Sequence, residues 1–150
     1  MPRLLVVHHT ASPATRTLLE EVLAGANHPD LEGAVEVVDR PALVASAVET
    51  LEADGYLLGC PANIGYMAGA MKHYLDTVYY PCLGQTDGRP LGLWVHGNDD
   101  TAGAVRALTA ITGALGWKLA AEPLSVTAPI DATTRAACRD LGATLAASLL

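Results

Sequence analysis

The sequence predicts an α/β domain in which five parallel strands form one sheet with helices on both faces. Short apolar runs rich in valine and leucine alternate with longer segments whose apolar residues recur at helical spacing. This alternation is typical of βαβ units, whose strands are parallel and whose crossovers are right-handed. A chain of 150 residues can build one substantial core, so we expect a single domain over residues 1–150.

Two strand–helix units open the chain. Residues 4–7 and 35–38 are the expected strands, because each is a short apolar run. The first helix is expected to begin at the pair Ser12-Pro13, since serine caps a helix and proline suits its first position, and to end at Gly25. The second helix is expected to begin at Pro41 and to bury Leu43, Val44, Val48 and Leu51.

The third strand is expected at residues 56–59, and its helix from about Met67, with Met71, Leu75 and Val78 on the buried face. A connection rich in proline and glycine, residues 80–90, follows. It leads to the last elements: a strand at 91–95, a helix at 101–115, a strand between 118 and 126, and a helix that begins at Asp131 as its N-cap.

Three loops each follow an apolar strand and precede a helix: residues 8–15, 59–72 and 96–103. The carboxyl ends of parallel strands meet at one edge of a sheet, and open α/β sheets bind ligands there. The first loop is rich in hydroxyl groups and opens a helix, which favours a phosphate group. The sequence therefore predicts a small-molecule site for a phosphate-bearing ring cofactor.

Composition narrows the classes of partner. A net charge of −7 argues against nucleic acid and anionic membrane surfaces, and the apolar runs are too short to span a membrane. We expect no secretion signal, because no long apolar segment follows a charged start. The three cysteines, Cys60, Cys82 and Cys138, lack metal-site spacing, and their odd number fits a reducing compartment, so we expect a cytoplasmic protein.

Residues 53–76 carry the most specific pattern: a strand that ends in Gly59-Cys60-Pro61, a short loop that closes on Gly65, a helix start of small residues, and Lys72 followed by Leu75-Asp76. This resembles the second flavin loop of the flavodoxin-like FMN proteins, and among them the NAD(P)H-dependent FMN and quinone reductases. The order of elements is similar over nearly the whole chain, and Asp87-Gly88-Arg89-Pro90 resembles a Gly-Lys-Pro step of that family. The resemblance implies a flavodoxin-like sheet of order 2-1-3-4-5, FMN as cofactor and NAD(P)H as co-substrate.

The other two loops are weaker matches. The first resembles a hydroxyl-rich phosphate loop, with Thr10, Ser12 and Thr15 in the hydroxyl positions, but Pro13 removes one backbone donor. The third matches in its place and its two glycines, yet it carries two acids and no aromatic residue. The FMN-binding residues that the resemblance implies are His9, Thr10, Ser12, Ala14 and Thr15 in the first loop, Pro61, Ala62, Asn63, Ile64, Gly65, Tyr66 and Met67 in the second, and His96, Gly97 and Asn98 in the third.

Within this set, residues 63–66 would lie beside the flavin ring, with backbone N–H groups facing its N5 and O4 side; an ordinary surface turn has similar composition. The side chains of His8 and His9 should point to opposite faces, so we expect one of the two to face the core and to bond to backbone, and we expect His8 to be a plain strand-end histidine. For His96 a contact with the ring edge and a plain strand-end position stay equally open. Cys60 is expected to be a buried structural thiol rather than a nucleophile. Met67 and Met71 are expected in the core on the third helix, and Asp99 and Asp100 to cap a helix rather than bind metal.

Three functions remain open. The first is an oxidoreductase that passes hydride from NAD(P)H to a quinone, flavin or similar small acceptor, which needs no catalytic side chain because the flavin carries the chemistry. The second is a one-electron carrier, which the charge favours and the lack of an aromatic residue in the third loop disfavours. The third is a scaffold without cofactor. Phosphoacceptor, cobalamin-binding and α/β-hydrolase domains are excluded because their motifs are absent. Apolar and aromatic residues at 79–84 predict a homo-oligomer.

Overall fold

The computed structural model describes residues 1–127 and 129–150. Its sheet runs in the order β2-β1-β3-β5-β6, and all of these neighbours are parallel. The strands are β1 (Arg3–His8), β2 (Glu36–Pro41), β3 (Gly55–Asn63), β5 (Pro90–His96), β6 (Lys118–Leu119) and β7 (Leu124–Val126), with β7 also paired to β5. If β6 and β7 are counted as one interrupted strand, the order is the predicted 2-1-3-4-5.

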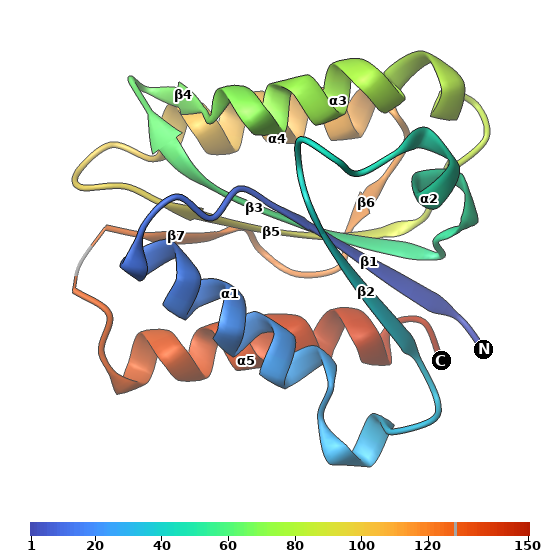
Figure 1. Cartoon of the computed structure of the whole chain (residues 1–150), viewed down its shortest axis with the longest axis horizontal. Coiled ribbons are helices and arrows are strands. Elements are labelled where there is room, and N and C mark those ends of the chain that lie inside the picture. Colours follow the sequence, from blue (N-terminus) through green and yellow to red (C-terminus); the bar gives the residue numbers. More distant parts are fainter. Residues whose placement is uncertain (128) are drawn as a thin grey trace.

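Helices cover both faces of this sheet (Figure 1). On one face lie α1 (Pro13–Ala26) and α5 (Ala132–Ala147), and on the other α2 (Ala47–Glu52), α3 (Gly69–Cys82) and α4 (Ala102–Ala114); a short 3-10 helix, η1 (Pro29–Leu31), follows α1. Alternate residues of β1 face opposite layers, so Val6 packs towards α1 and α5 while Leu5 and Val7 pack towards the other helices. The predicted α/β sandwich is confirmed.

Gly25 lies inside α1, which continues through Ala26 to its cap at Asn27, so the predicted helix end at Gly25 is wrong. A Cβ atom on Gly25 would lie 1.9 Å from the backbone oxygen of Arg139 in α5. In return, a Cβ atom on Gly142 would lie 2.0 Å from the backbone oxygen of Val22 in α1. Both glycines therefore serve the close approach of two helices rather than a helix end.

The second helix is shorter and later than predicted. Pro41 is the last residue of β2, and α2 begins at Ala47, where Ser46 and Glu49 form a capping box. The prediction that this helix begins at Pro41 is wrong because the capping box, and not the proline, sets the start. As a result three residues predicted to be buried are exposed: Leu43, Val44 and Val48.

Three further boundaries differ from the prediction. Met67 belongs to a two-residue strand, β4 (Tyr66–Met67), which folds back on β3, so α3 begins only at Gly69. At its other end α3 continues through Pro81 to Cys82, past the predicted loop start at residue 80. The fifth strand is interrupted at residues 120–123, where proline removes a ladder donor.

Arg89, which immediately precedes β5, has a structural role. Its guanidinium group donates to the carbonyl oxygens of Leu51 and Ala53 at 2.8 and 2.7 Å, which closes the carboxyl end of α2, and to the Tyr56 hydroxyl at 3.1 Å. The Tyr56 ring stacks on Trp117 with centroids 3.9 Å apart. Burial raises the pKa of Tyr56 to about 12, so the phenol stays protonated and bonded.

Candidate functional site

The three predicted loops leave the sheet side by side at its carboxyl edge (Figure 1). His8 lies opposite Gly59 in the parallel register, and the N–H of His9 donates to the Gly59 carbonyl oxygen at 3.0 Å. Pro61 lies opposite His96 on the next strand. The sheet thus brings the starts of all three loops onto adjacent strands, as the sequence predicts.

Side-chain hydroxyls close the first loop onto the start of α1. Thr15 is buried, and its Oγ1 accepts the N–H groups of Ala11 at 3.1 Å and Ser12 at 2.9 Å. Ser12 Oγ accepts the Thr15 N–H at 3.2 Å in return. Two of the three hydroxyl residues therefore already cap the helix in the protein alone.

The same loop also leaves donors free for an anion. The N–H groups of Thr10 and Ala14 have no acceptor among residues 1–127 and 129–150, and Pro13 has no N–H to offer. Both donors lie at the amino end of a helix of 14 residues, where the backbone dipole favours negative charge. Together with the exposed Ser12 hydroxyl, they fit a phosphate group, with fewer donors than a loop without proline would give.

His8 stands behind this loop. Its side chain is buried, with Nδ1 2.9 Å from Thr10 Oγ1 and Nε2 3.8 Å from the Asp39 carboxylate. Burial lowers the pKa of His8, although Asp39 acts in the opposite direction. His8 is thus the member of the histidine pair that faces the core, and the predicted backbone partner is wrong, because its ring bonds to the Thr10 hydroxyl. His9 is half-buried beside it.

The second loop is a tight hairpin. Ala62 pairs with Met67 and Asn63 with Tyr66, and the turn consists of Ile64 and Gly65 with φ angles of 50° and 71°. A β-branched residue in the left-handed region is strained, and strain of this kind gathers at functional sites.

The hairpin tip presents free donors. Within the part of the chain that the structure describes, the N–H groups of Ile64 and Gly65 donate to no protein atom, and both residues are exposed. They fit a ring that carries acceptor atoms at its edge. The Met67 side chain, by contrast, is buried in the core, so Met67 can offer a ligand only its backbone.

The first turn of helix α4 packs against the hairpin. A Cβ atom on Gly103 would lie 1.9 Å from the Gly65 carbonyl oxygen, so the first turn of α4 touches the hairpin backbone directly. The composition of residues 63–66 is that of an ordinary turn, but it did not predict a two-residue hairpin, because Ile-Gly is not one of the dipeptides that favour such turns. The glycine at 103, inside a helix, was the available signal of a close approach.

The third loop is held by its own acids. Asp99 Oδ1 accepts the Asp100 N–H at 2.8 Å, and Asp100 Oδ1 accepts the Ala102 N–H at 3.1 Å at the start of α4. The N-cap of α4 is nevertheless Thr101, which makes no side-chain cap hydrogen bond, so the predicted N-cap role of Asp99 and Asp100 is wrong. The described residues hold no cluster of histidine, cysteine and acids suited to a metal ion. His96 and Gly97 are half-buried, and Asn98 is exposed.

Cys60 is a buried thiol that stays protonated at neutral pH. Its thiol is 2% exposed, and burial raises its pKa to about 11. A thiolate would be needed for nucleophilic attack, so the prediction of a structural thiol is confirmed.

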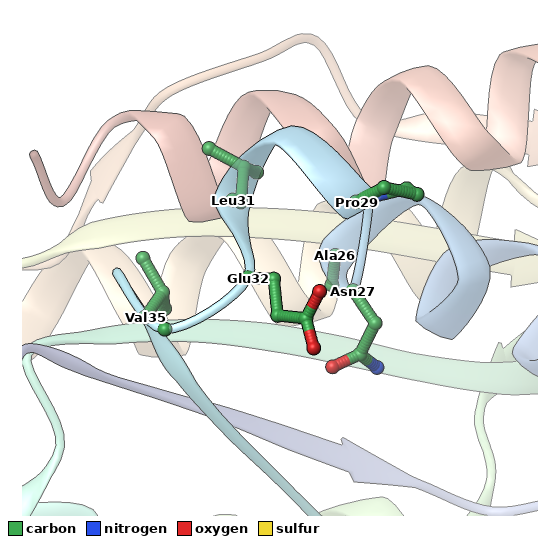
Figure 2. Close-up of a pocket in the computed structure, with 7 residues that line it drawn as sticks. Ala26, Asn27, Pro29, Leu31, Glu32 and Val35 are labelled. Carbon is green, nitrogen blue, oxygen red and sulfur yellow. The ribbon is translucent and has the colours of Figure 1, made fainter.

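A cavity of about 380 Å³ lies away from these loops, between the end of α1, η1 and the start of β2 (Figure 2). Asn27, Leu31, Glu32 and Val35 are among its lining residues. Since β2 begins there, this cavity belongs to the amino edge of the sheet, opposite the candidate site. Among the described residues, no helix has the length and apolar character needed to cross a bilayer.

No family model matches the chain. A flavodoxin from Aquifex aeolicus (strain VF5) is 29% identical in an alignment that covers 97% of this chain and 86% of that protein. A solved flavodoxin from the domain Archaea superposes with a TM-score of 0.81 over 98% of each chain, at 17% identity. The chain has a flavodoxin-like fold.

Two more solved structures place the flavodoxin-like fold across the whole chain. An oxidised flavodoxin from Bacillus cereus matches with a TM-score of 0.82 over 99% of each chain, at 16% identity. A flavodoxin, WrbA-like protein from Agrobacterium tumefaciens matches with a TM-score of 0.78 over 99% of this chain and 98% of that one, at 17% identity. The predicted fold class is thereby confirmed.

Proposed function

We propose that this flavodoxin-like chain binds FMN at the carboxyl edge of its sheet and works as an oxidoreductase. The observation that carries the proposal is the placement of two pairs of free backbone donors on adjacent loops: Thr10 and Ala14 at the start of α1, and Ile64 and Gly65 at the hairpin tip. One pair suits a phosphate and the other a ring edge. The flavodoxin relative supports the choice of FMN.

In this proposal each loop has a distinct task. The α1 dipole and the first-loop donors hold the phosphate, with Ser12 adding a hydroxyl. The hairpin orients the ring, and its strained Ile64, which costs about 1–3 kcal/mol, is tolerated because of that task. FMN, when bound, supplies the capacity to accept a hydride or single electrons. No side chain needs to move a proton.

We propose further that NAD(P)H is the electron source and a quinone, flavin or similar small molecule the acceptor. The third loop supports this step, because residues 96–101 carry no tyrosine, tryptophan or phenylalanine that would cover a ring face. The exposed positions at Asn98, Asp99 and Asp100 leave the approach open. An uncovered face suits a nicotinamide ring, which must stack on the flavin.

A one-electron carrier is the second candidate. The relative named a flavodoxin favours it, and so does the net charge of −7, because an acidic surface steers a protein towards basic redox partners. We propose the cytoplasm as its compartment, which the three free, buried cysteines support.

One preparation tests both candidates. Cofactor released by heat from the purified or reconstituted protein should be FMN, and the loaded protein should oxidise NADH or NADPH when a quinone is supplied. A loaded protein that ignores both nucleotides but exchanges electrons with one-electron donors would establish the carrier. Failure to bind any flavin after reconstitution would contradict both.

A further inference from the structure

A second cavity lies beside the hairpin, on the side of α4. Its volume is about 360 Å³, within the range of roughly 300–1,000 Å³ that small-molecule sites occupy. Two lining residues come from the hairpin and five from one face of α4, where they recur at spacings of three and four: Gly65, Tyr66, Gly103, Arg106, Ala107, Ala110 and Ile111.

The cavity is built into the fold. The contact between Gly103 and Gly65 fixes the hairpin above α4, while Ala107 and Ala110 leave the space between them open. On the adjoining face of the helix Ala104 and Leu108 are fully buried, so α4 cannot rotate without disturbing the core. A ligand would therefore meet a preformed apolar surface.

Arg106 gives this cavity its charge. No carboxylate lies within 4.0 Å of its guanidinium group in either described range, 1–127 or 129–150. Most other cations of this acidic chain are occupied: five pair with acids, and Arg89 donates to carbonyl oxygens. An unpaired guanidinium group beside an apolar cavity is suited to an anion with an apolar body.

We propose that this cavity binds a flat aromatic anion of two or three fused rings, such as an aryl carboxylate. The ring would lie along Ala107 and Ala110 beside the Tyr66 side chain, which is 42% exposed. The carboxylate would meet the fork of N–H donors of Arg106. This site shares Gly65 and Tyr66 with the second predicted FMN loop, but its charge comes from Arg106 and its apolar wall from α4, so it goes beyond the proposed function.

The test compares 2-naphthoate with its neutral analogue 2-naphthamide by isothermal titration calorimetry and methyl NMR. The acid should bind one site and shift the methyl signals of Ala107 and Ala110, and the amide should bind about tenfold more weakly, because a charge-assisted hydrogen bond is lost. Arg106→Gln should remove that difference, and Ala110→Trp should abolish binding of both ligands.

Two matched variants serve as controls. Lys118→Gln removes a different unpaired cation and Ala24→Trp adds a ring at a different exposed helical position, so neither should change binding of 2-naphthoate. The proposal is overturned if 2-naphthoate does not bind, if its shifts lie elsewhere, or if Arg106→Gln weakens both ligands equally. The assay needs no flavin, so its failure is separate from failure of the proposed function.

Discussion

The carbonyl oxygen of Gly65 and the Cα atom of Gly103 approach so closely that no side chain fits between them: a Cβ atom on Gly103 would lie 1.9 Å from that oxygen. The hairpin that carries the proposed ring donors therefore rests on backbone, not on adaptable side chains. Because backbone cannot move aside as a side chain can, the position of the hairpin depends on the absence of a single methyl group.

Gly103→Ala should destabilise the protein by about 1–3 kcal/mol, as overpacking does, and should weaken FMN binding because the hairpin is displaced. Urea unfolding and flavin titration measure the two effects. Gly113→Ala is the matched control on the same helix, since nothing lies within 4 Å of its added Cβ. It should stabilise by about 0.5–1 kcal/mol. If the two variants have the same free energy of unfolding and the same FMN affinity, the close contact between Gly103 and Gly65 does not constrain the hairpin.

Ile64→Asn should stabilise the flavin-free protein by about 1 kcal/mol. Asparagine tolerates the left-handed backbone at φ 50°, and Asn-Gly is a preferred turn for a two-residue hairpin. The isoleucine side chain is fully exposed, so no burial is lost. Leu43→Asn, at another exposed apolar residue, should give no such gain. If Ile64→Asn does not raise the free energy of unfolding either, the backbone at Ile64 in the hairpin turn is not strained.

His8 should make stability depend on pH in one direction. Burial lowers its pKa in the folded state below the ordinary value of 6.5, so the unfolded chain binds more protons as pH falls. The neutral His8 side chain therefore contributes its full stability above about pH 6.5. This stability is lost as the pH falls through the lowered pKa of the folded state. His8→Gln should flatten the thermal midpoint between pH 7.5 and 5 relative to the wild type, whereas His73→Gln, at an exposed residue, should not.

The first-loop hydroxyls separate helix capping from phosphate binding. Thr15→Ala should cost about 1–2 kcal/mol of stability even without flavin, because the backbone N–H groups of Ala11 and Ser12 lose their acceptor. Ser12→Ala should cost about 1 kcal/mol through loss of the N-cap. Each of Thr10→Ala, Ser12→Ala and Thr15→Ala should also weaken FMN binding by about 1 kcal/mol or more. Thr17→Ala is the control and should not change FMN affinity. If the three loop variants also leave FMN affinity unchanged, the loop only caps α1 and does not bind the phosphate.

Self-association, which we propose for this chain, should involve the end of α3. Tyr80 is 81% exposed and packs edge-on against Tyr79 with ring centroids 5.2 Å apart, and Leu83 beside them is also exposed. Exposed aromatic patches are typical of interfaces. Sedimentation at micromolar concentration should show a dimer that Tyr80→Lys dissociates and Leu119→Lys does not. A wild-type monomer of 15.6 kDa would refute the proposal.

The strands and their convergent loops could be predicted because buried parallel strands are continuous apolar runs, which residues 56–58 and 91–95 show plainly. The start of α2 was missed because two signals compete there, and the capping box at Ser46 overrides Pro41. The hairpin was missed because its turn violates local preference at Ile64. Local propensity fails most often where a site imposes its own geometry.

The edges of this sheet bear on its behaviour at high concentration. At one edge the fifth strand is broken into pieces of two and three residues around Pro123, and at the other β2 ends in Asp39, Arg40 and Pro41, all exposed. Short, charged or proline-bearing edges resist pairing with strands of another molecule. The chain is thus protected against edge-to-edge aggregation, and copies that meet must do so through their helices.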